Sequence, residues 1–340
     1  MKAIRIHQFG GPEVLKYEDV PDPQPRHDQV LVRVRACAMN HLDIWVRKGV
    51  PGVTFPRILG SDIAGEVVSV GDYITDIKPG RRVLLAPMTF CGVCPKCTSG
   101  QQNFCPQFGV IGARVDGGNC ELMAVPRVNV IPIPDSMNFD EAASVPLVFL
   151  TAWHMLVARA GLRPGQTVLV LGAGSGVGSA AIQICKLFNA TVITTAGNDA
   201  KLARARELGA DYGIDHYKQK ISDEVKRITN KTGVDIVFEH VGPATWQESL
   251  KSLKPGGTVV TCGATTGREA QIDLNFLYSR QQSYLGSFMG NMGDLYEVLG
   301  HVFAGHLKPV VDRTFPLSEA AEAHRYLESS EMFGKVVLKP

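Results

Sequence analysis

A glycine-rich turn that joins an apolar strand to a helix constrains the fold of this chain more than any other segment. Residues 168–186 read VLVLGAGSGVGSAAIQICK. Glycines let the backbone turn sharply and approach a pyrophosphate, which then lies at the N-terminus of the following helix. The segment therefore predicts a dinucleotide site. Its candidate residues are Gly172, Gly174, Ser175, Gly176, Val177 and Gly178.

Strand-like and helix-like segments alternate around this turn. The β-like runs are TVLVLG, TVITTAG, DIVFEHVG, TVVTCG and SYLGSF, and between several of them lie helix-like segments such as AAIQICKLF and AKLARARELGA. This alternation is typical of a parallel, doubly wound sheet covered by helices. We predict an α/β domain of this kind over residues 134–287.

The first half of the chain has shorter β-like runs and more frequent turns. The runs QVLVRVRACAM, GEVVSV, RRVLLAP and ELMAV are apolar or alternating, and PDPQP, KPG and DGG separate them. Short strands with Gly and Pro between them indicate a barrel or a sandwich. We predict a separate β-rich domain over residues 1–133.

Four cysteines lie close together in FCGVCPKCTSGQQNFC, residues 90–105. Thiolates on short loops can converge on one tetrahedral zinc ion, and four of them leave no open position for water or substrate. Some iron–sulfur segments begin with the same spacing, but their fourth cysteine follows sooner, and a disulfide is the remaining alternative. We predict one structural zinc per chain, in a lobe over about residues 90–106. Its ligands would be Cys91, Cys94, Cys97 and Cys105.

Composition narrows the range of partners and locations. The chain has 340 residues, is 45% hydrophobic and has a formal net charge of +2, which gives no reason to expect nucleic acid or a membrane as partner. Its most apolar stretch, AASVPLVFLTAWHMLVA, is too interrupted for a spanning helix. The opening MKAIRIHQFG has no apolar signal region, and four of the eight cysteines are clustered, so we expect a cytoplasmic location.

The strand after the glycine turn bears on the choice of cofactor. NAD-binding domains place an acid about 20 residues after the glycines to hold the ribose 2′-hydroxyl. Here that position is Ala196, and Asp199 is placed to cap the next helix. Lys201 and Arg204 follow, and either could accept a 2′-phosphate or could be an ordinary solvated charge. We predict NADP(H) in preference to NAD(H).

These features together resemble the medium-chain dehydrogenase/reductase superfamily. The resemblance covers essentially the whole chain and includes MKAIRIHQFGGPEVLKYEDVPDPQP, ILGSDIAGEVVSVG, the cysteine lobe and the glycine turn. It implies a GroES-like β-barrel catalytic domain, which residues 288–340 rejoin, and a Rossmann domain. It also implies that nicotinamide and substrate meet in the cleft between the two.

The same resemblance predicts that the catalytic zinc ligands are missing. The positions of the cysteine and histidine ligands of zinc alcohol dehydrogenases fall on Asn40 and Ser61, and the third ligand falls near Leu147. A catalytic zinc needs three protein ligands and an open position. His41 and Asp43 could be drafted as substitutes, but a shifted pair would not restore this geometry.

Without that metal, alcohol oxidation loses its stabilised alkoxide. Enones and quinones remain suitable, because hydride addition gives a delocalised anion that a few hydrogen-bond donors can stabilise. The Asn-x-x-Asp of residues 40–43 resembles the motif of the zinc-free quinone oxidoreductase and enoyl-reductase branch. It implies that Asn40 presents its amide to the substrate oxygen and that Asp43 orients neighbouring groups through Arg47. Alternatively, Asn40 ties down a turn and Arg47 is a surface cation.

Further site residues follow from the resemblance alone. Thr151 matches a residue beside the nicotinamide, with helix packing as the alternative. Three strand-end segments match positions that contact the cofactor: Val241 and Gly242; Cys262, Gly263 and Ala264; and Gly286, Ser287 and Phe288. Cys262 has no neighbouring base or cation that would make it a nucleophile.

We therefore expect an NADPH-dependent reductase of quinones or α,β-unsaturated carbonyl compounds, enoyl thioesters included. One alternative is a zinc-dependent alcohol dehydrogenase with unusual ligands, and another is a sensor that binds NADP without turnover. The resemblance favours a homodimer or homotetramer with a small carbonyl or quinone substrate as its partner.

Overall fold

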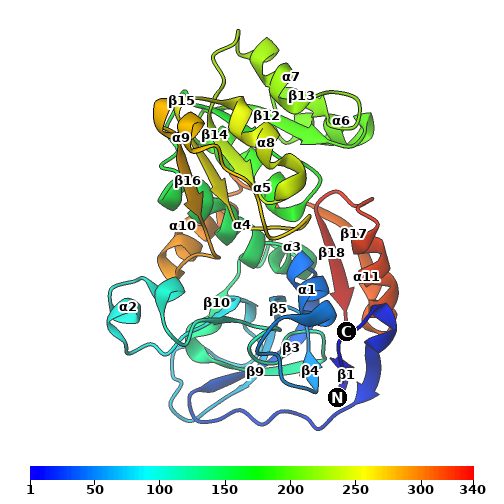
Figure 1. Cartoon of the computed structure of the whole chain (residues 1–340). Coiled ribbons are helices and arrows are strands. Elements are labelled where there is room, and N and C mark those ends of the chain that lie inside the picture. The colour runs from blue at the N-terminus through cyan, green and yellow to red at the C-terminus, as the bar shows by residue number, and fades with distance from the viewer. The chain divides into compact units, whose positions relative to one another are not determined.

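The computed structural model describes every residue from Met1 to Pro340. The chain divides into two compact units (Figure 1). The first unit comprises Met1–Leu147, Val302–Ala304 and Lys308–Pro340, and the second comprises Val148–His301 and Gly305–Leu307. These limits lie about 14 residues further along the chain than the predicted domain limits of 134 and 287. Leu147, the last residue of the long first segment of this unit, donates its backbone amide to Asp62 at 2.7 Å.

The first unit is built from β-sheets. Its main sheet has the order β10-β6-β5-β3-β18-β17, with β9 paired to the other end of β3. These strands are β3 (Gln29–Ala38), β5 (Asp62–Val70), β6 (Arg82–Leu85), β9 (Leu122–Pro126), β10 (Val130–Pro132), β17 (Val311–Pro316) and β18 (Lys335–Lys339). A second sheet has the order β2-β1-β4, with β1 (Lys2–Ile6), β2 (Lys16–Asp19) and β4 (Arg57–Ile58). The runs predicted in the first half of the chain coincide with β3, β5, β6 and β9.

The last strand of the chain returns to this sheet. Strand β18, red in Figure 1, pairs antiparallel with β3, and Val337 lies opposite Ala38. The Met39 amide donates to the Val336 carbonyl at 2.8 Å. The end of the chain is thus fixed against the segment that leads from β3 into α1 (His41–Gly49).

Short helices complete the first unit. They are α1, α2 (Pro95–Thr98), α3 (Phe139–Ala143), α11 (Ala320–Glu328) and the 3-10 turns η1 (Pro12–Val14), η2 (Gln102–Phe104), η3 (Arg127–Asn129) and η5 (Leu317–Glu319). A two-stranded ribbon, β7 (Met88–Thr89) and β8 (Gly109–Val110), carries the cysteine lobe between its strands. Two apolar clusters form the core, one centred on Val30, Val32 and Ile63 and the other on Ile4, Ile44 and Leu338.

The second unit is a six-stranded sheet in which every pair is parallel. Its order is β13-β12-β11-β14-β15-β16. The strands are β11 (Thr167–Val170), β12 (Thr191–Ala196), β13 (Tyr212–Asp215), β14 (Val234–Glu239), β15 (Leu253–Thr261) and β16 (Ser283–Gly286). The order reverses between β11 and β14, and doubly wound sheets bind ligands beyond the carboxyl ends of the strands at such a reversal. Sequence analysis had found five of the six strands and missed β13.

Helices follow the strands of this sheet as the alternation predicted. They are α4 (Pro146–Trp153, from Val148 onward in this unit), α5 (Gly176–Leu187), α6 (Asp199–Glu207), α7 (Ile221–Ile228), α8 (Pro243–Ser252), α9 (Leu274–Ser279) and α10 (Met292–Phe303, to His301 in this unit). A π-helical segment, η4 (His154–Arg159), continues directly from α4. No helix in the structure combines the length and the apolar character that crossing a membrane requires. The fold class is therefore α/β, as predicted.

Candidate functional site

The glycine-rich turn lies between β11 and α5 and is shaped to receive an anion. Gly172 has φ +61°, and a Cβ added at Gly178 would lie 2.3 Å from the Gly172 carbonyl oxygen, so both positions require glycine. Ser175 caps α5: its Oγ accepts from the Gly178 amide at 2.9 Å and donates to the Gly172 carbonyl at 2.8 Å. The N-terminus of a 12-residue helix therefore faces the turn with its positive end.

A second turn at the same edge of the sheet is held by Glu239, the last residue of β14. Its carboxylate is fully buried and accepts from the Val241 amide at 2.6 Å and the Gly242 amide at 2.9 Å. The hydroxyls of Thr245 and Ser249 donate to the same carboxylate at 3.0 and 2.7 Å. A carboxylate with these donors fixes a turn in which Gly242 has φ +97°.

His240 lies between these two turns. Its Nε2 lies 2.9 Å from the Leu171 carbonyl and 3.4 Å from Ser175 Oγ, and its ring is 3.1 Å from where a Cβ of Gly172 would be. Burial lowers the pKa of His240, so the imidazole is neutral at pH 7. Sequence analysis missed both Glu239 and His240, although EHVG directly follows a strand, where site residues collect.

The remaining predicted cofactor residues also lie at the carboxyl ends of strands. Cys262 and Gly263 follow β15, and a Cβ at Gly263 would come within 2.8 Å of the His240 carbonyl oxygen. Ser287 and Phe288 follow Gly286 at the end of β16; the Ser287 amide donates to the Thr261 carbonyl at 2.8 Å. The Ser287 hydroxyl is buried without a partner. Burial raises the pKa of Cys262 to about 12, which removes it as a nucleophile at neutral pH.

The end of β12 has no acid. The strand ends at Ala196, and Asn198 caps α6 by accepting from the Lys201 amide at 2.9 Å, so the prediction that Asp199 is the cap is wrong: Asp199 is already the first residue of the helix. A Cβ at Gly197 would lie 2.6 Å from the Tyr217 ring, so this strand end is closely covered by the next connection. The structure thus places the predicted cofactor residues around one edge of one sheet, with Lys201 on the first turn of the helix after β12.

Four polar side chains form a buried cluster in the first unit, at the point where β3 leads into α1. Lys335 Nζ lies 2.6 Å from Asn40 Oδ1 and 2.9 Å from Asp62 Oδ2. Asn40 Nδ2 donates to the same Asp62 oxygen at 2.9 Å. The other oxygen of Asp62 accepts from the Leu147 amide at 2.7 Å. The side chains of Asp62 and Lys335 are 0% and 3% exposed, so this is a buried ion pair whose members also hydrogen-bond to Asn40.

Asp43 is the fourth member of the cluster and supports its backbone. One oxygen accepts from the Asn40 amide at 2.7 Å and the other from the Gly60 amide at 2.9 Å. Burial raises the pKa of Asp43 to about 6, against the lowering effect of these two amides and of Lys335. Asp43 therefore holds the start of α1 beside the segment that carries Ser61 and Asp62.

The predicted link between Asp43 and Arg47 is wrong. Arg47 is 0% exposed, which also excludes the alternative of a surface cation. Its guanidinium contacts His324 Nδ1 at 3.0 Å and donates to Glu328 at 2.8 Å, both on α11. Arg47 lies one helical turn beyond Asp43 and could have reached it, but the two Asp43 oxygens already accept from the Asn40 and Gly60 amides, and the guanidinium is taken up by α11.

Thr151 belongs to the second unit, where it lies on α4. It is buried, and its hydroxyl has no hydrogen-bond partner. A buried hydroxyl without a partner is uncommon in folded proteins and is compatible with a bound group that completes it. The structure thus brings Asn40 and Asp43 together within the first unit. Lys335 had no role predicted from the sequence.

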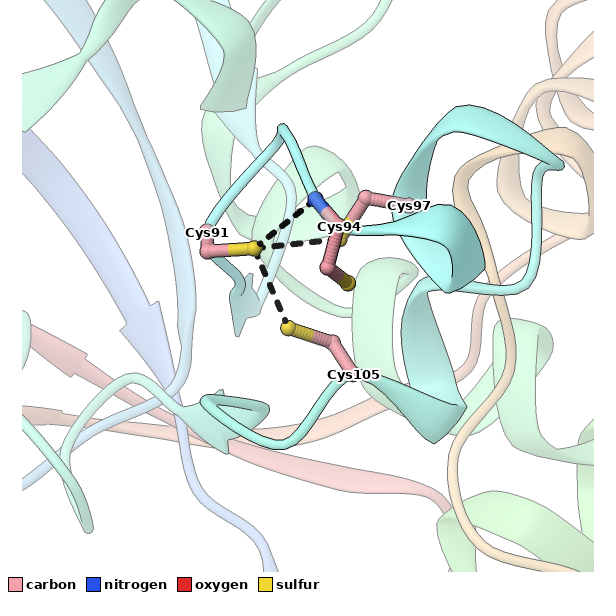
Figure 2. Close-up of side chains that lie close together, drawn as sticks. All are labelled: Cys91, Cys94, Cys97 and Cys105. Atoms are coloured by element: carbon pink, nitrogen blue, oxygen red, sulfur yellow. Dashed lines mark hydrogen bonds between the residues drawn. The ribbon is translucent and has the colours of Figure 1, made fainter.

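The four cysteines of the lobe converge (Figure 2). Their sulfur atoms all lie within 4.8 Å of one another, and Cys91 Sγ is 3.9 Å from Cys97 Sγ and 3.6 Å from Cys105 Sγ. Tetrahedral zinc with Zn–S bonds of about 2.3 Å requires sulfur–sulfur distances of about 3.8 Å, which these pairs approach. Backbone amides of Val93 and Cys94 lower the pKa of Cys91 to about 6, which favours the thiolate that binds metal. The four residues fit a closed zinc site.

Both halves of the chain resemble known dehydrogenase domains. Residues 26–135 match the alcohol dehydrogenase GroES-like domain, and residues 176–304 match the zinc-binding dehydrogenase family. An NAD-dependent alcohol dehydrogenase of Sulfurisphaera tokodaii is 32% identical over 100% of both chains. A quinone oxidoreductase of Rattus norvegicus is 31% identical over 99% of this chain and 97% of its own. The crystal structure of an NAD-dependent alcohol dehydrogenase is 43% identical, with a TM-score of 0.97 over 100% of both chains.

Proposed function

The chain belongs to the medium-chain dehydrogenase/reductase superfamily and is an NAD(P)-dependent oxidoreductase, and from that premise we propose its substrate class. We propose that it reduces quinones or α,β-unsaturated carbonyl compounds with NADPH, enoyl thioesters included, and that no metal takes part in hydride transfer. The zinc that it carries is, in this proposal, the structural one held by the cysteine lobe.

The buried cluster around Asn40 carries the proposal. The positions matched to catalytic zinc ligands hold an amide, a hydroxyl and a leucine, namely Asn40, Ser61 and Leu147. The carboxylate nearest to them, Asp62, is already paired with the Lys335 ammonium, whose nitrogen also lies 2.6 Å from Asn40 Oδ1. A fixed positive charge between these two oxygen ligands opposes the binding of a divalent cation. The four-cysteine group is also the one cluster of at least three potential metal-binding side chains in the chain.

The second unit supports the cofactor part of the proposal. The N-terminus of α5 would hold the pyrophosphate, and the turn fixed by Glu239 would meet the ribose. When bound, the nicotinamide supplies or accepts a hydride. The hydroxyls of Thr151 on α4 and Ser287 after β16 are buried and have no hydrogen-bond partner. In this proposal both hydrogen-bond to the cofactor, because buried hydroxyls are normally satisfied.

The choice of NADP(H) over NAD(H) depends on the end of β12. Ala196 leaves no carboxylate that would hold a ribose 2′-hydroxyl or repel a 2′-phosphate, and Lys201 lies on the first turn of α6. Phosphate at that place would gain from both the lysine charge and the helix N-terminus. The relatives named as NAD-dependent argue the other way, and dissociation constants for NADPH and NADH, measured by quenching of tryptophan fluorescence, would decide between them.

Hydride addition to an enone leaves a negative charge on the carbonyl oxygen, and the protein has to stabilise it. We assign that task to the side-chain amide of Asn40, one of whose two N–H bonds is used by Asp62. Asp43 fixes the backbone from which this amide projects. Since each donor aimed at such an oxyanion contributes about 10²–10³ in rate, Asn40 is the residue whose loss should matter most.

The proposal is tested by following NADPH oxidation with a panel of quinones, enones and enoyl thioesters. Turnover of at least one of these, unaffected by a chelator that leaves the cysteine lobe loaded, is the expected result. Asn40→Ala should lower kcat about 100-fold while leaving the dissociation constant of NADPH unchanged. Failure of every acceptor in the panel would refute the proposal.

A second candidate is a zinc-dependent alcohol dehydrogenase with unusual ligands. The observation that favours it is the set of relatives named alcohol dehydrogenase, one of which is 43% identical. It requires a metal at Asp62 and its neighbours and therefore displacement of Lys335. Oxidation of alcohols that increases when zinc is added to the assay would support it.

Two further expectations remain proposals. We propose a homodimer or homotetramer, which light scattering after gel filtration would determine. We also propose a cytoplasmic location, which agrees with eight free cysteines in the structure.

A further inference from the structure

We propose that Lys335 is a positioning residue for the reaction: it orients the side-chain amide of Asn40 and strengthens that amide as a hydrogen-bond donor toward the substrate oxygen. The inference deepens the proposed function and rests on it for the identity of the acceptor. It gives a role to a buried charged side chain, the ammonium of Lys335 on the last strand, that neither cofactor binding nor the zinc lobe requires.

The ammonium reaches this place through tightly fixed backbone. Gly334, directly before Lys335, has φ +105°, and a Cβ there would lie 2.4 Å from the Val310 carbonyl oxygen. The Lys335 amide donates to that same carbonyl at 2.8 Å. On the other side, the Met39 amide donates to Val336. The Lys335 backbone is thus held in β18, beside the segment that leads from β3 to Asn40, with little freedom to change the distance between the two side chains.

The two ends of the Asn40 amide are distinguished by charge. Its oxygen accepts from the Lys335 ammonium at 2.6 Å, and its nitrogen donates to the Asp62 carboxylate at 2.9 Å. An amide turned by 180° would place its NH₂ against the ammonium and its oxygen against the carboxylate, and both contacts would be repulsive. The ion pair therefore fixes which end of the amide points where.

The same contact affects the donor strength of the amide. A cation bonded to the carbonyl oxygen of an amide draws electron density from its nitrogen, and bonds in such a chain strengthen one another. Asn40 has two N–H bonds on Nδ2, and Asp62 accepts one of them. The other is the donor that we assign to the substrate oxygen, and Lys335 makes it a stronger one.

The strand offers a matched control for this effect. Lys339 lies four residues beyond Lys335 on β18, is 49% exposed and pairs with Asp140 at 3.0 Å. It has the same side chain on the same strand but does not contact the cluster. Replacing it tests the removal of a lysine from β18 without disturbing Asn40.

Turnover is measured for Lys335→Met and for Lys335→Met combined with Asp62→Asn, because the single variant leaves Asp62 buried without a partner and could fail to fold. Both variants should have kcat lowered about tenfold, less than the loss expected when Asn40 itself is removed. KM should change little, and NADPH should bind as in the wild type. Lys335→Arg, which keeps the charge, should retain most of the activity, and Lys339→Met should retain all of it.

Two results would overturn the proposal. One is a double variant with wild-type kcat, which would mean that Lys335 serves only to neutralise Asp62. The other comes from NMR of protein labelled at its asparagine side chains, with the Asn40 signals assigned from Asn40→Ala. The Asn40 amide protons should shift upfield in Lys335→Met and stay in place in Lys339→Met, and unshifted signals in Lys335→Met would contradict the inference.

The NMR measurement also separates this inference from the proposed function. If the wild type reduces no quinone, enone or enoyl thioester, the proposed function fails. The shift of the Asn40 signals still shows whether Lys335 polarises that amide. If the wild type is active and the signals do not move, the function stands and the role of Lys335 is wrong.

Discussion

Glu239 gives the most informative single perturbation of the cofactor site. It ends β14, is fully buried and accepts hydrogen bonds from two backbone amides and two hydroxyls of the turn that follows. Glu239→Leu keeps a side chain of similar size but removes every acceptor. Glu239→Gln keeps one acceptor oxygen for the amides of Val241 and Gly242. Its NH₂ can donate to the hydroxyls of Thr245 and Ser249, which can turn to accept.

The size of the effect follows from these contacts. Each buried amide left without a partner costs about 1–3 kcal/mol, so Glu239→Leu should lower the free energy of unfolding by about 2–6 kcal/mol. If about 2 kcal/mol of this is spent on reordering the turn when the cofactor binds, the affinity for NADPH falls about 30-fold. Glu239→Gln removes only the charge of the acceptor, so its affinity for NADPH should stay within about threefold of the wild-type value.

Fluorescence titration with NADPH, alongside urea unfolding, measures both quantities. Glu248→Gln is the control, because Glu248 is a carboxylate on α8 that accepts from the Ser222 amide at 2.9 Å and does not contact the turn. It should bind NADPH as the wild type does. The reasoning is refuted if Glu239→Leu binds NADPH within twofold of the wild type, or if the Gln and Leu variants are equally impaired.

Three further predictions concern stability, the lobe and the cofactor. Burial, with the Arg47 charge, lowers the pKa of His324 to about 3, below the unfolded value of about 6.5. As the pH falls, this histidine is therefore protonated in the unfolded state before it is protonated in the folded state. Lowering the pH from 7.5 to 5 should reduce the free energy of unfolding by about 2 kcal/mol. Urea unfolding at both pH values should show a smaller loss in His324→Gln and the same loss in His27→Gln, which replaces an exposed histidine as a control. Equal losses in the wild type and both variants would mean that His324 is not the residue responsible. Elemental analysis should show that Cys91→Ser has lost its zinc, and its lobe should be cleaved more readily by protease. Its kcat should stay within about threefold of the wild-type value, because in the proposed function the lobe takes no part in the chemistry. A kcat that falls as zinc is lost would mean that this zinc is needed for catalysis. Lys201→Glu should weaken NADPH binding about tenfold and leave NADH unaffected in the same titration, whereas equal effects on both would exclude a role for Lys201 at the 2′-phosphate.

The parts of this molecule that depend on local sequence were predictable. The glycine turn, the strands around it and the cysteine lobe are each set by residues within about 20 positions of one another, so spacing alone indicates the geometry. Strand β13 was missed because YGID contains a glycine and an aspartate, two residues that are uncommon in strands and interrupt the apolar pattern. The α/β class was nevertheless fixed by the five stronger strands.

Contacts between distant parts of the chain were not predictable in the same way. Arg47 suggested a link to the nearby Asp43, but its partners His324 and Glu328 lie 277 and 281 residues away. Lys335 looked like an ordinary strand-end lysine, since nothing in GKVVLKP indicates burial beside Asp62, 273 residues earlier. Such pairs are set by which strands become neighbours, and that information lies in the tertiary structure.

Glu239 is an intermediate case. An acid at the end of a strand of a doubly wound sheet could hold a ribose, and it could equally hold the turn that follows it. The structure shows the second, because one oxygen accepts from the amides of Val241 and Gly242 and the other accepts from the hydroxyls of Thr245 and Ser249. The sequence EHVG contained the signal, but the geometry of the turn was needed to interpret it.

The most direct test of metal-free hydride transfer is the zinc content of the active enzyme. Zinc per chain is measured by elemental analysis in the same dialysed sample whose NADPH-dependent reduction of enones and quinones is assayed. One zinc per chain at full activity is the predicted result, because the proposed function assigns one ion to the four cysteines and none to the cluster of Asn40, Asp62 and Lys335. Two zinc ions per chain, with activity lost in step with the second, would contradict the account.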